Sequence, residues 1–335
     1  MNIRLAIGSS GGRATATLLF LVLLFGLLRI AGAASAPRED MLDVHFIDEK
    51  SGWASGRWGT VVGTNDGGHT WRRQSTGVDY TLAGIHFVDD KNGWAVGDKG
   101  TIIHTADGGK TWVKQHSPVP LFLMRVRFRN PQVGWIVAER THILYTNDGG
   151  ATWTVQFSDG DFILKSLAFA DDKNGWAVGE YGHIYHTTDA GKSWVKQAGR
   201  YGMSEQTGEI LGDNFLFDIC AVDAKNAWVV GIDGYVARTE DGGASWHEIK
   251  TGAAKTQVFS VAASGGSVVI AGNGLLLTSG DNGASWKRAK TTPSADYGWF
   301  YRLASHRNGY VAVGWQGAIY VSDTKAENWQ RAVYE

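Results

Sequence analysis

The sequence predicts an all-β fold, a seven-bladed β-propeller over residues 40–335 with four-stranded antiparallel blades. The first observation is an internal repeat, because tryptophans recur at intervals of 40 to 52 residues. These tryptophans are Trp71, Trp112, Trp153, Trp194, Trp246, Trp286 and Trp329. The second observation is that each repeat contains four short apolar segments separated by turn residues. The third is composition, since 45 Gly and 15 Trp beside only 5 Pro are typical of many tight turns between short strands.

The second repeat shows the expected elements of one blade. Apolar and polar residues alternate over 82–88 around Ile85 and Phe87, as in a half-buried strand. In order, the predicted strands are 82–88, 94–97, 101–105 and 111–114, and the turns are 89–93, 98–100 and 107–110. Four short strands in about 41 residues correspond to one propeller blade.

Seven such units are expected to close into a ring, because a single blade cannot bury its apolar residues alone. The expected blades are approximately 41–76, 77–117, 118–158, 159–199, 211–251, 252–291 and 297–335, with an insertion at 199–216. The chain enters on an inner strand and ends on an outer one. We therefore expect the ring to close by packing of the first blade against the last, and the sequence shows no strand exchanged across the seam.

Residues 1–36 are expected to be a signal peptide or an N-terminal membrane anchor, and 37–335 the propeller. Arg4 and Arg13 precede an apolar run at 14–28, and small residues follow at 31–36. The run is short for a membrane span, which favours a cleaved signal. Arg29 is awkward for processing, so an uncleaved anchor remains the alternative. Both interpretations place the propeller outside the cytoplasm, in the periplasm or a comparable lumen.

Composition argues against several classes of function. A net charge of −1 does not favour a nucleic-acid partner, which would need a strongly basic face. The single cysteine, Cys220, cannot form an intrachain disulfide or a cysteine metal cluster, and the ten His residues show no ligand spacing. We therefore expect no metal and no cofactor.

A second motif occupies the turn between the third and fourth strands of each repeat, Ser/Thr-x-Asp-x-Gly-x-x-Trp. Its aspartates are Asp66, Asp107, Asp148, Asp189, Asp241 and Asp281, and the seventh copy, which ends at Trp329, is degenerate. The carboxylate can accept backbone N–H groups within the turn, and the glycine permits positive φ. We interpret these aspartates as structural rather than catalytic. The motif is identified as the Asp box, or BNR motif.

Longer segments carry a more specific resemblance. "DDKNGWAVGDKGTIIHTADGGKTW" and "DDKNGWAVGEYGHIYHTTDAGKSW" resemble the photosystem II stability/assembly factor family and its bacterial relatives. The resemblance extends over about residues 42–333. It implies a seven-bladed propeller in a lumen or periplasm that binds a protein partner, without enzymatic activity, during assembly of a membrane complex. It does not imply a photosystem for this chain. We expect a monomer that meets the membrane only through an uncleaved N-terminal segment.

The expected binding face carries the Gly-x-x-Gly turns and the connections between blades, because the Asp-box face is nearly uniform. One turn position reads Arg57, Asp98, Glu139, Glu180, Ile232, Gly272 and Trp315 around the ring. Its three carboxylates predict an acidic arc for a basic peptide or a cation, or else solvated turn residues. Trp58, Arg140 and Tyr181 lie in the same turns. The aromatic residues of this face favour protein or sugar contact, with loop packing as the alternative.

Two departures from the repeat complete the candidate site. The insertion, with Tyr201 and Phe215 among its residues, enlarges the connection between blades 4 and 5. Insertions in repeat proteins usually mark the functional face, although a decorative loop is the alternative. Arg125 and Arg127 alternate along the inner strand of blade 3, where they replace small or polar residues of sister blades such as Ser166 and Ala168. They could line the channel, form a basic patch, or pair with Glu139 or Asp161.

The alternative function is a glycoside hydrolase, a sialidase-like enzyme or a carbohydrate-binding propeller. Sialidases and some glucanases also carry Asp boxes, and Asp98, Glu139 and Glu180 could supply a pair of carboxylates. Residues 37–44 do not match the N-terminal arginine segment that resemblance to sialidases would imply. We therefore expect a protein that is not an enzyme.

Overall fold

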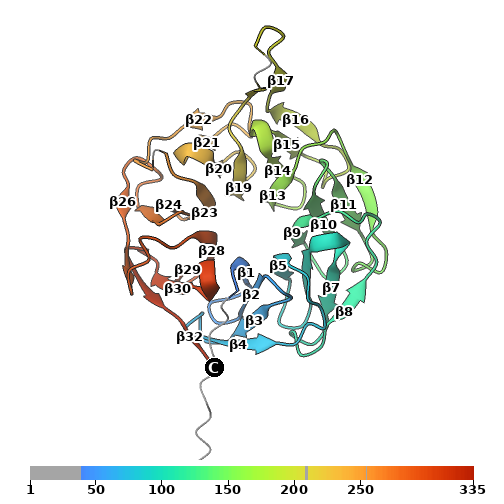
Figure 1. Cartoon of the computed structure of the whole chain (residues 1–335), viewed down its shortest axis with the longest axis vertical. Coiled ribbons are helices and arrows are strands. Elements are labelled where there is room, and N and C mark those ends of the chain that lie inside the picture. The colour runs from blue at the N-terminus through green and yellow to red at the C-terminus, as the bar shows by residue number, and fades with distance from the viewer. Residues whose placement is uncertain (1–38, 208–209, 254) are drawn as a thin grey trace, which may run out of the picture. The chain divides into compact units, whose positions relative to one another are not determined.

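The computed structural model describes residues 39–207, 210–253 and 255–335, and it confirms the predicted fold class. Seven sheets, each built on four antiparallel strands, surround a common axis (Figure 1). The expected export segment lies outside the described residues. Within them, no helix is both long and apolar enough for a membrane crossing.

Blades 1 to 4 follow the same strand order from the axis to the rim. Their strands are β1 Met41–Phe46, β2 Gly52–Gly56, β3 Val61–Thr64 and β4 Thr70–Gln74; β5 Leu82–Phe87, β6 Gly93–Gly97, β7 Ile102–Thr105 and β8 Val113–Gln115; β9 Leu123–Phe128, β10 Gly134–Ala138, β11 Ile143–Thr146 and β12 Thr154–Phe157; and β13 Leu164–Phe169, β14 Gly175–Gly179, β15 Ile184–Thr187 and β16 Val195–Ala198. The insertion forms a separate hairpin, β17 Tyr201–Met203 with β18 Ile210–Gly212.

Blades 5 to 7 repeat this order. Their strands are β19 Leu216–Ala221, β20 Ala227–Gly231, β21 Val236–Thr239 and β22 His247–Glu248; β23 Val258–Ser264, β24 Ser267–Gly272, β25 Leu275–Ser279 and β26 Lys287–Arg288; and β28 Phe300–His306, β29 Gly309–Gly314, β30 Ile319–Asp323 and β31 Asn328–Arg331. Two short strands remain, β27 Lys290–Thr292 and β32 Val333–Tyr334. The 3-10 turns are η1 Asp98–Gly100, η2 Glu180–Gly182, η3 Ile232–Gly234 and η4 Trp315–Gly317.

The hydrophobic core lies between the blades rather than within them. Seven clusters of buried apolar residues are found among the described residues, one between each pair of neighbouring blades. Between blades 1 and 2, the Trp53 ring stacks on Phe87 with 3.6 Å between centroids, and Phe87 meets Trp112 edge to face. Such ring pairs add roughly 0.5–1.5 kcal/mol to the burial itself. The repeated tryptophans therefore join each blade to the next.

The first and last blades each contain a fifth strand that was not predicted from the sequence. β32, at the C-terminus, adds in parallel to β4, with Val333 opposite Thr70 and Tyr334 opposite Trp71. β27 adds in the same way to β31. The expectation that packing alone closes the ring was therefore wrong, since the last residues of the chain also pair with the first blade. A strand of two residues has no periodicity that a sequence pattern could show.

Candidate functional site

Six of the seven Gly-x-x-Gly turns share one backbone geometry. In blade 1 the N–H of Thr60 donates to the carbonyl of Arg57 over 3.1 Å, and Trp58 and Gly59 have φ values of 55° and 66°. Two consecutive left-handed residues make a type I′ turn, which favours Asn-Gly. In this chain the first left-handed position holds Trp58, Lys99, Arg140, Tyr181, Asp233 and Gln316. A left-handed non-glycine residue costs roughly 1–2 kcal/mol, and Trp58, 69% exposed, gains little burial in return.

The base of the insertion is an aromatic cluster. The Tyr181 ring lies 4.6 Å from Tyr201 and 4.7 Å from Phe215, centroid to centroid, and Phe162 contacts both tyrosines. The structure therefore brings together three candidate residues from the turn, the insertion and the blade connection. The hairpin β17–β18 projects outward from the rim of the ring rather than over its axis (Figure 1).

A second aromatic cluster lies where β19, β23 and β28 begin. Phe259 lies 5.3 Å from Phe217, 5.6 Å from Tyr301 and 6.0 Å from Trp299, measured between ring centroids. Phe217, Phe259 and Tyr301 occupy the extra residue of the β-bulge in each inner strand. Phe217 and Phe259 were not predicted from the sequence, because a bulge breaks the period-two pattern that assigns a side chain to a face. Comparing the same bulge position in all seven repeats would have found them.

Two of the three carboxylates in the predicted acidic arc accept backbone hydrogen bonds. An oxygen of Glu139 accepts the N–H of Phe122 over 3.1 Å, and one of Glu180 accepts the N–H of Ile163 over 3.0 Å. Both carboxylates thus bind the connection that leads into their own blade. Lys165 interacts with both, which opposes the lowering of its pKa by burial. Blades 3 and 4 therefore carry two glutamates that interact with the same lysine.

Asp40 links Arg57 to the turn that holds Trp315, at the seam between blades 1 and 7. The Arg57 Nε lies 3.0 Å from a carboxylate oxygen of Asp40, whose other oxygen accepts the N–H of Gln316 over 3.1 Å. Trp315 precedes Gln316 and remains 44% exposed. The exposed aromatics Trp58 and Trp315 therefore flank one ion pair on this face.

At the axis, side chains of one blade bind the free edge of the next. The N–H of Ile85 donates to Asp43, that of Val261 donates to Asp218, and that of Leu303 donates to Ser260. Inner strands are sheet edges, and unpaired edge N–H groups need such acceptors. We call the residues at this level the axial belt: Asp43, Gly84, Arg125, Ser166, Asp218, Ser260 and Arg302.

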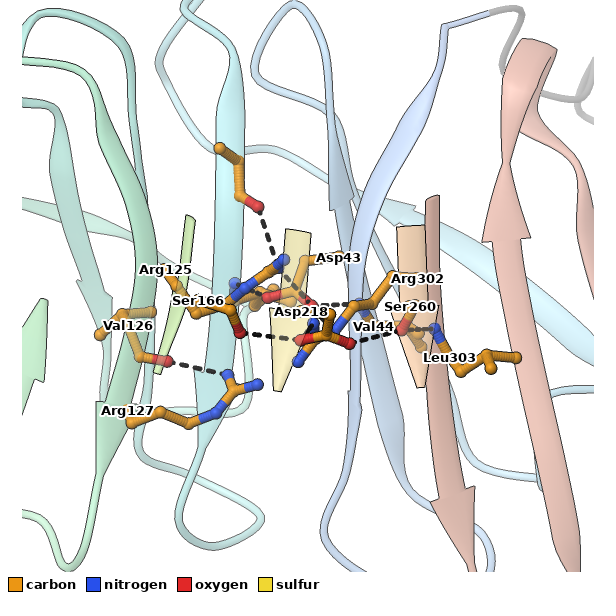
Figure 2. Close-up of polar contacts among 12 residues, drawn as sticks. Asp43, Val44, Arg125, Val126, Arg127, Ser166, Asp218, Ser260, Arg302 and Leu303 are labelled. Atoms are coloured by element: carbon orange, nitrogen blue, oxygen red, sulfur yellow. Dashed lines mark hydrogen bonds and ion pairs between the residues drawn. The ribbon is translucent and has the colours of Figure 1, made fainter. Parts of the chain in front are cut away.

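The axial belt contains a buried ion network (Figure 2). Asp43 lies 2.8 Å from Nη1 of Arg125 and 3.3 Å from Nε of Arg302. Arg302 also pairs with Asp218, which accepts the hydroxyls of Ser166 and Ser260, each over 2.8 Å. Burial alone would raise the pKa of Asp43 and Asp218, but the arginines lower it overall. The network joins blades that are not neighbours, across the axis.

Arg127 lies one level closer to the Asp-box face. Its guanidinium donates to the carbonyl of Val126 over 2.9 Å, and no carboxylate of the described chain lies within ion-pair distance of it. Burial, opposed by Asp43 and strengthened by Arg302, lowers the pKa of Arg127 to about 9. Burial, with Arg127 nearby, lowers the pKa of His45 to about 3, so that this imidazole is neutral.

The arginines of blade 3 do not have the partners that the sequence suggested. Arg125 pairs with Asp43 instead of Glu139 or Asp161, and Asp161 faces Arg140 at 3.8 Å. The reason is that inner strands meet at the axis, where residues far apart in the sequence are closer than neighbours along the blade.

The Asp-box carboxylates are bound within their own turns. In blade 2, Asp107 accepts the Thr105 hydroxyl over 2.8 Å, the N–H of Thr111 over 2.8 Å and the Thr111 hydroxyl over 2.6 Å. These hydrogen bonds, first that of the Thr111 side chain, lower the pKa of Asp107 to about 2. Among the described residues, no group of three or more His, Cys, Asp or Glu side chains is placed to hold a metal ion.

The comparisons with known proteins agree with this geometry. The family model described as Photosynthesis system II assembly factor YCF48 matches residues 35–121, 115–198 and 203–335. The chain is similar to the solved structure described as YCF48 bound to D1 peptide, with 21% identity, a TM-score of 0.69, and coverage of 86% of this chain and 93% of that one. YCF48 from Cyanidioschyzon merolae gives 19% identity, a TM-score of 0.69, and coverage of 84% and 95%.

A GH74 xyloglucanase from Xanthomonas campestris is also similar, with 12% identity, a TM-score of 0.71, and coverage of 90% of this chain and 55% of that one. At such identities these structures share the fold alone. No curated protein sequence matches the chain. Because the family model extends over almost the whole propeller, the chain belongs to the family of Photosynthesis system II assembly factor YCF48.

Proposed function

We propose that this chain is a non-enzymatic, exported propeller that binds a partner protein and serves as an assembly or stability factor for a membrane complex. Family membership supports this class of function. The related structure described as YCF48 bound to D1 peptide supports a peptide segment of the partner as the ligand. The location we propose is the periplasm or a comparable lumen, and the protein acts as a monomer.

The docking surface is the Gly-x-x-Gly face. The observation that carries this is Trp58, which combines a left-handed backbone with an exposed side chain. A tryptophan in the left-handed conformation is unfavourable for folding, yet its ring stays in solvent. Strain of this kind tends to occur at functional sites. Exposed tryptophan and tyrosine side chains are also the usual anchors of protein interfaces.

The two aromatic clusters extend this surface in two directions. The cluster of Phe217, Phe259, Trp299 and Tyr301 offers an apolar area near the axis. The cluster of Tyr181, Tyr201 and Phe215 supports the projecting hairpin at the rim. A peptide that lies between the two clusters would pass Lys165 and the carboxylates of Glu139 and Glu180, which offer charges of both signs.

Site-specific photo-crosslinking in the native envelope tests the proposal. A photoreactive phenylalanine analogue replaces Trp58 or Tyr201, and a matched control replaces Lys110 on the Asp-box face. We expect the same protein to be captured from positions 58 and 201 and not from 110. Capture of no protein, or of the same protein from all three positions, would contradict the docking surface.

The second candidate is carbohydrate hydrolysis, which the likeness to GH74 xyloglucanase favours. Hydrolysis normally needs one carboxylic acid and one carboxylate beside the scissile bond. Glu139 and Glu180 each hold a backbone N–H, which ties them to a structural role. A panel of glucans and sialosides decides the matter: turnover that Glu139→Gln and Glu180→Gln abolish would establish the enzyme and overturn our proposal.

A further inference from the structure

At the axis, two carboxylates of the protein are bound by the same pair of groups. Asp43 accepts the N–H of Ile85, on the inner strand of the next blade, over 2.9 Å, and pairs with Arg125 at 2.8 Å. Asp218 accepts the N–H of Val261 over 3.1 Å and pairs with Arg302. In both cases an arginine and an outward N–H of an inner strand bind one carboxylate together. Hydrogen bonds of this charge-assisted kind are the stronger ones in proteins.

One level toward the Asp-box face, imidazoles of two blades accept the inner-strand N–H of the next blade. The N–H of Phe87 donates to Nδ1 of His45, and that of Phe128 donates to Nδ1 of His86, each over 3.3 Å. Blade 3 carries Arg127 at this position, opposite Phe169 of blade 4. A guanidinium has donors only and cannot accept an N–H.

The N–H of Phe169 has the same direction as its counterparts. Phe169 pairs with Gly175 in the register in which Phe87 pairs with Gly93 and Phe128 with Gly134. In antiparallel sheets this register fixes whether an N–H points into the ladder or away from it. Arg127 and Phe169 therefore bring two kinds of donor to one place, and the Arg127 side chain offers no acceptor to the Phe169 N–H.

A cavity of about 340 Å³ lies at this place. Arg127, His86 and Ala168 line it toward the axis, and Trp135 and Phe169 add aromatic walls. The small Ala168 side chain leaves the space that Arg127 faces. The cavity extends to Asp171 and Asp172, in the turn that follows β13 on the Asp-box side. Asp171 is bound to the N–H groups of its own turn, and Asp172 interacts with Arg129.

Charge also favours an anion here. Three arginines, Arg125, Arg127 and Arg302, face two aspartates, Asp43 and Asp218, around the axis. Among the described residues, Arg127 is the arginine of these three that forms no ion pair with a carboxylate. Figure 2 shows its guanidinium below the axial belt, with a hydrogen bond to the carbonyl of Val126. Arg127 is partly buried and has no ion-pair partner among the described residues, so a bound anion would be favoured beside it.

We propose that this cavity binds a carboxylate group, with one oxygen on the Arg127 guanidinium and another on the Phe169 N–H. The aromatic walls suit a carboxylate with an apolar body. Either a small free carboxylate or the C-terminal carboxylate of a peptide supplies this chemistry. The site lies on the opposite side of the axial belt from the docking surface and does not depend on it.

Calorimetric titration of the full chain tests the site with matched probes. Phenylacetate is compared with phenylacetamide, and short peptides ending in phenylalanine are compared with their C-terminal amides. We expect a carboxylate probe to bind at least about tenfold more tightly than its amide. Binding of phenylacetate identifies a small free carboxylate as sufficient, whereas binding of the peptide acid alone identifies a chain terminus.

Arg127→Ala is the decisive variant, because three sister blades carry alanine at this position, Ala168, Ala262 and Ala304. It should lose carboxylate binding by about tenfold or more, while Arg57→Ala on the other face should not. Equal affinity for acid and amide, no binding by either acid, or unchanged binding by a folded Arg127→Ala variant would overturn the proposal. The comparison of acid with amide on the wild-type chain remains decisive if the variant does not fold.

Discussion

Asp43→Asn is the substitution that best isolates the buried ion network. Asparagine keeps the shape of the side chain, so the effect is electrostatic rather than a cavity. Asp43 is fully buried and binds groups of three other blades: Nη1 of Arg125 at 2.8 Å, the N–H of Ile85 at 2.9 Å and Nε of Arg302 at 3.3 Å. Removing one partner of a buried ion pair leaves an uncompensated charge and costs roughly 3–5 kcal/mol. We expect a loss of that size in the free energy of unfolding.

Urea unfolding followed by tryptophan fluorescence measures this loss by linear extrapolation. Asp172→Asn is the control, because Asp172 is exposed and its ion pair with Arg129 should contribute little. A second comparison replaces Asp218 and Arg302 together by serine, the residue of blades 4 and 6 at this level. The double variant should lose less stability than the sum of the single ones, because neither charge remains unpaired. A change below about 1 kcal/mol in Asp43→Asn would refute the reasoning.

Four further predictions concern acid, the turns and the seam. Because arginines lower the folded pKa of Asp43 and Asp218 below the ordinary 3.8, their contribution is present above that pH and is lost as pH falls through the folded values. The stability difference between wild type and Asp43→Asn should therefore shrink in acid, and a constant difference between pH 7 and pH 2 would contradict this. Thr105→Val should cost about 1–3 kcal/mol in urea unfolding, because it removes the acceptor of the buried Gly109 N–H; the matched exposed change, Thr111→Val, should cost less. Trp58→Gly should raise stability by about 1 kcal/mol by relieving the left-handed strain, and should weaken capture of the partner from position 201; a loss of stability would argue against strain. A chain that ends at Ala332 loses β32 and the buried Tyr334, and its melting temperature should fall by several degrees at least, whereas Glu335→Ala should leave it nearly unchanged.

Much of the architecture was predictable because the repeat is local. A tryptophan step of about 41 residues, alternation such as that over 82–88, and turn residues at fixed offsets each depend on residues near one another in the chain. The same local rules predicted which turns share a face, and so which side of the ring varies from blade to blade. The family resemblance added the class of function, and the family model matches nearly the whole propeller.

The candidate site was predictable only where the repeat itself places residues. Trp58, Tyr181 and Trp315 are turn residues by position, and the structure keeps them on one face. The local strain at Trp58 and Tyr181 was not visible, because the sequence does not show which turn residues have positive φ. The bulge residues Phe217 and Phe259 were missed because an inserted residue shifts the alternation by one.

The sequence by itself determined the number of blades, the turns and the residue types at each level of the ring. Only the tertiary structure decided which of these residues meet at the axis. Asp43 and Arg302 lie at opposite ends of the chain, yet ring closure brings them within 3.3 Å. Arg125 and Arg127 differ by two positions in one strand, but the first finds Asp43 and the second faces a cavity. The physical reason is that seven inner strands converge on one axis, so that partners there are set by the geometry of the ring and not by distance along the chain.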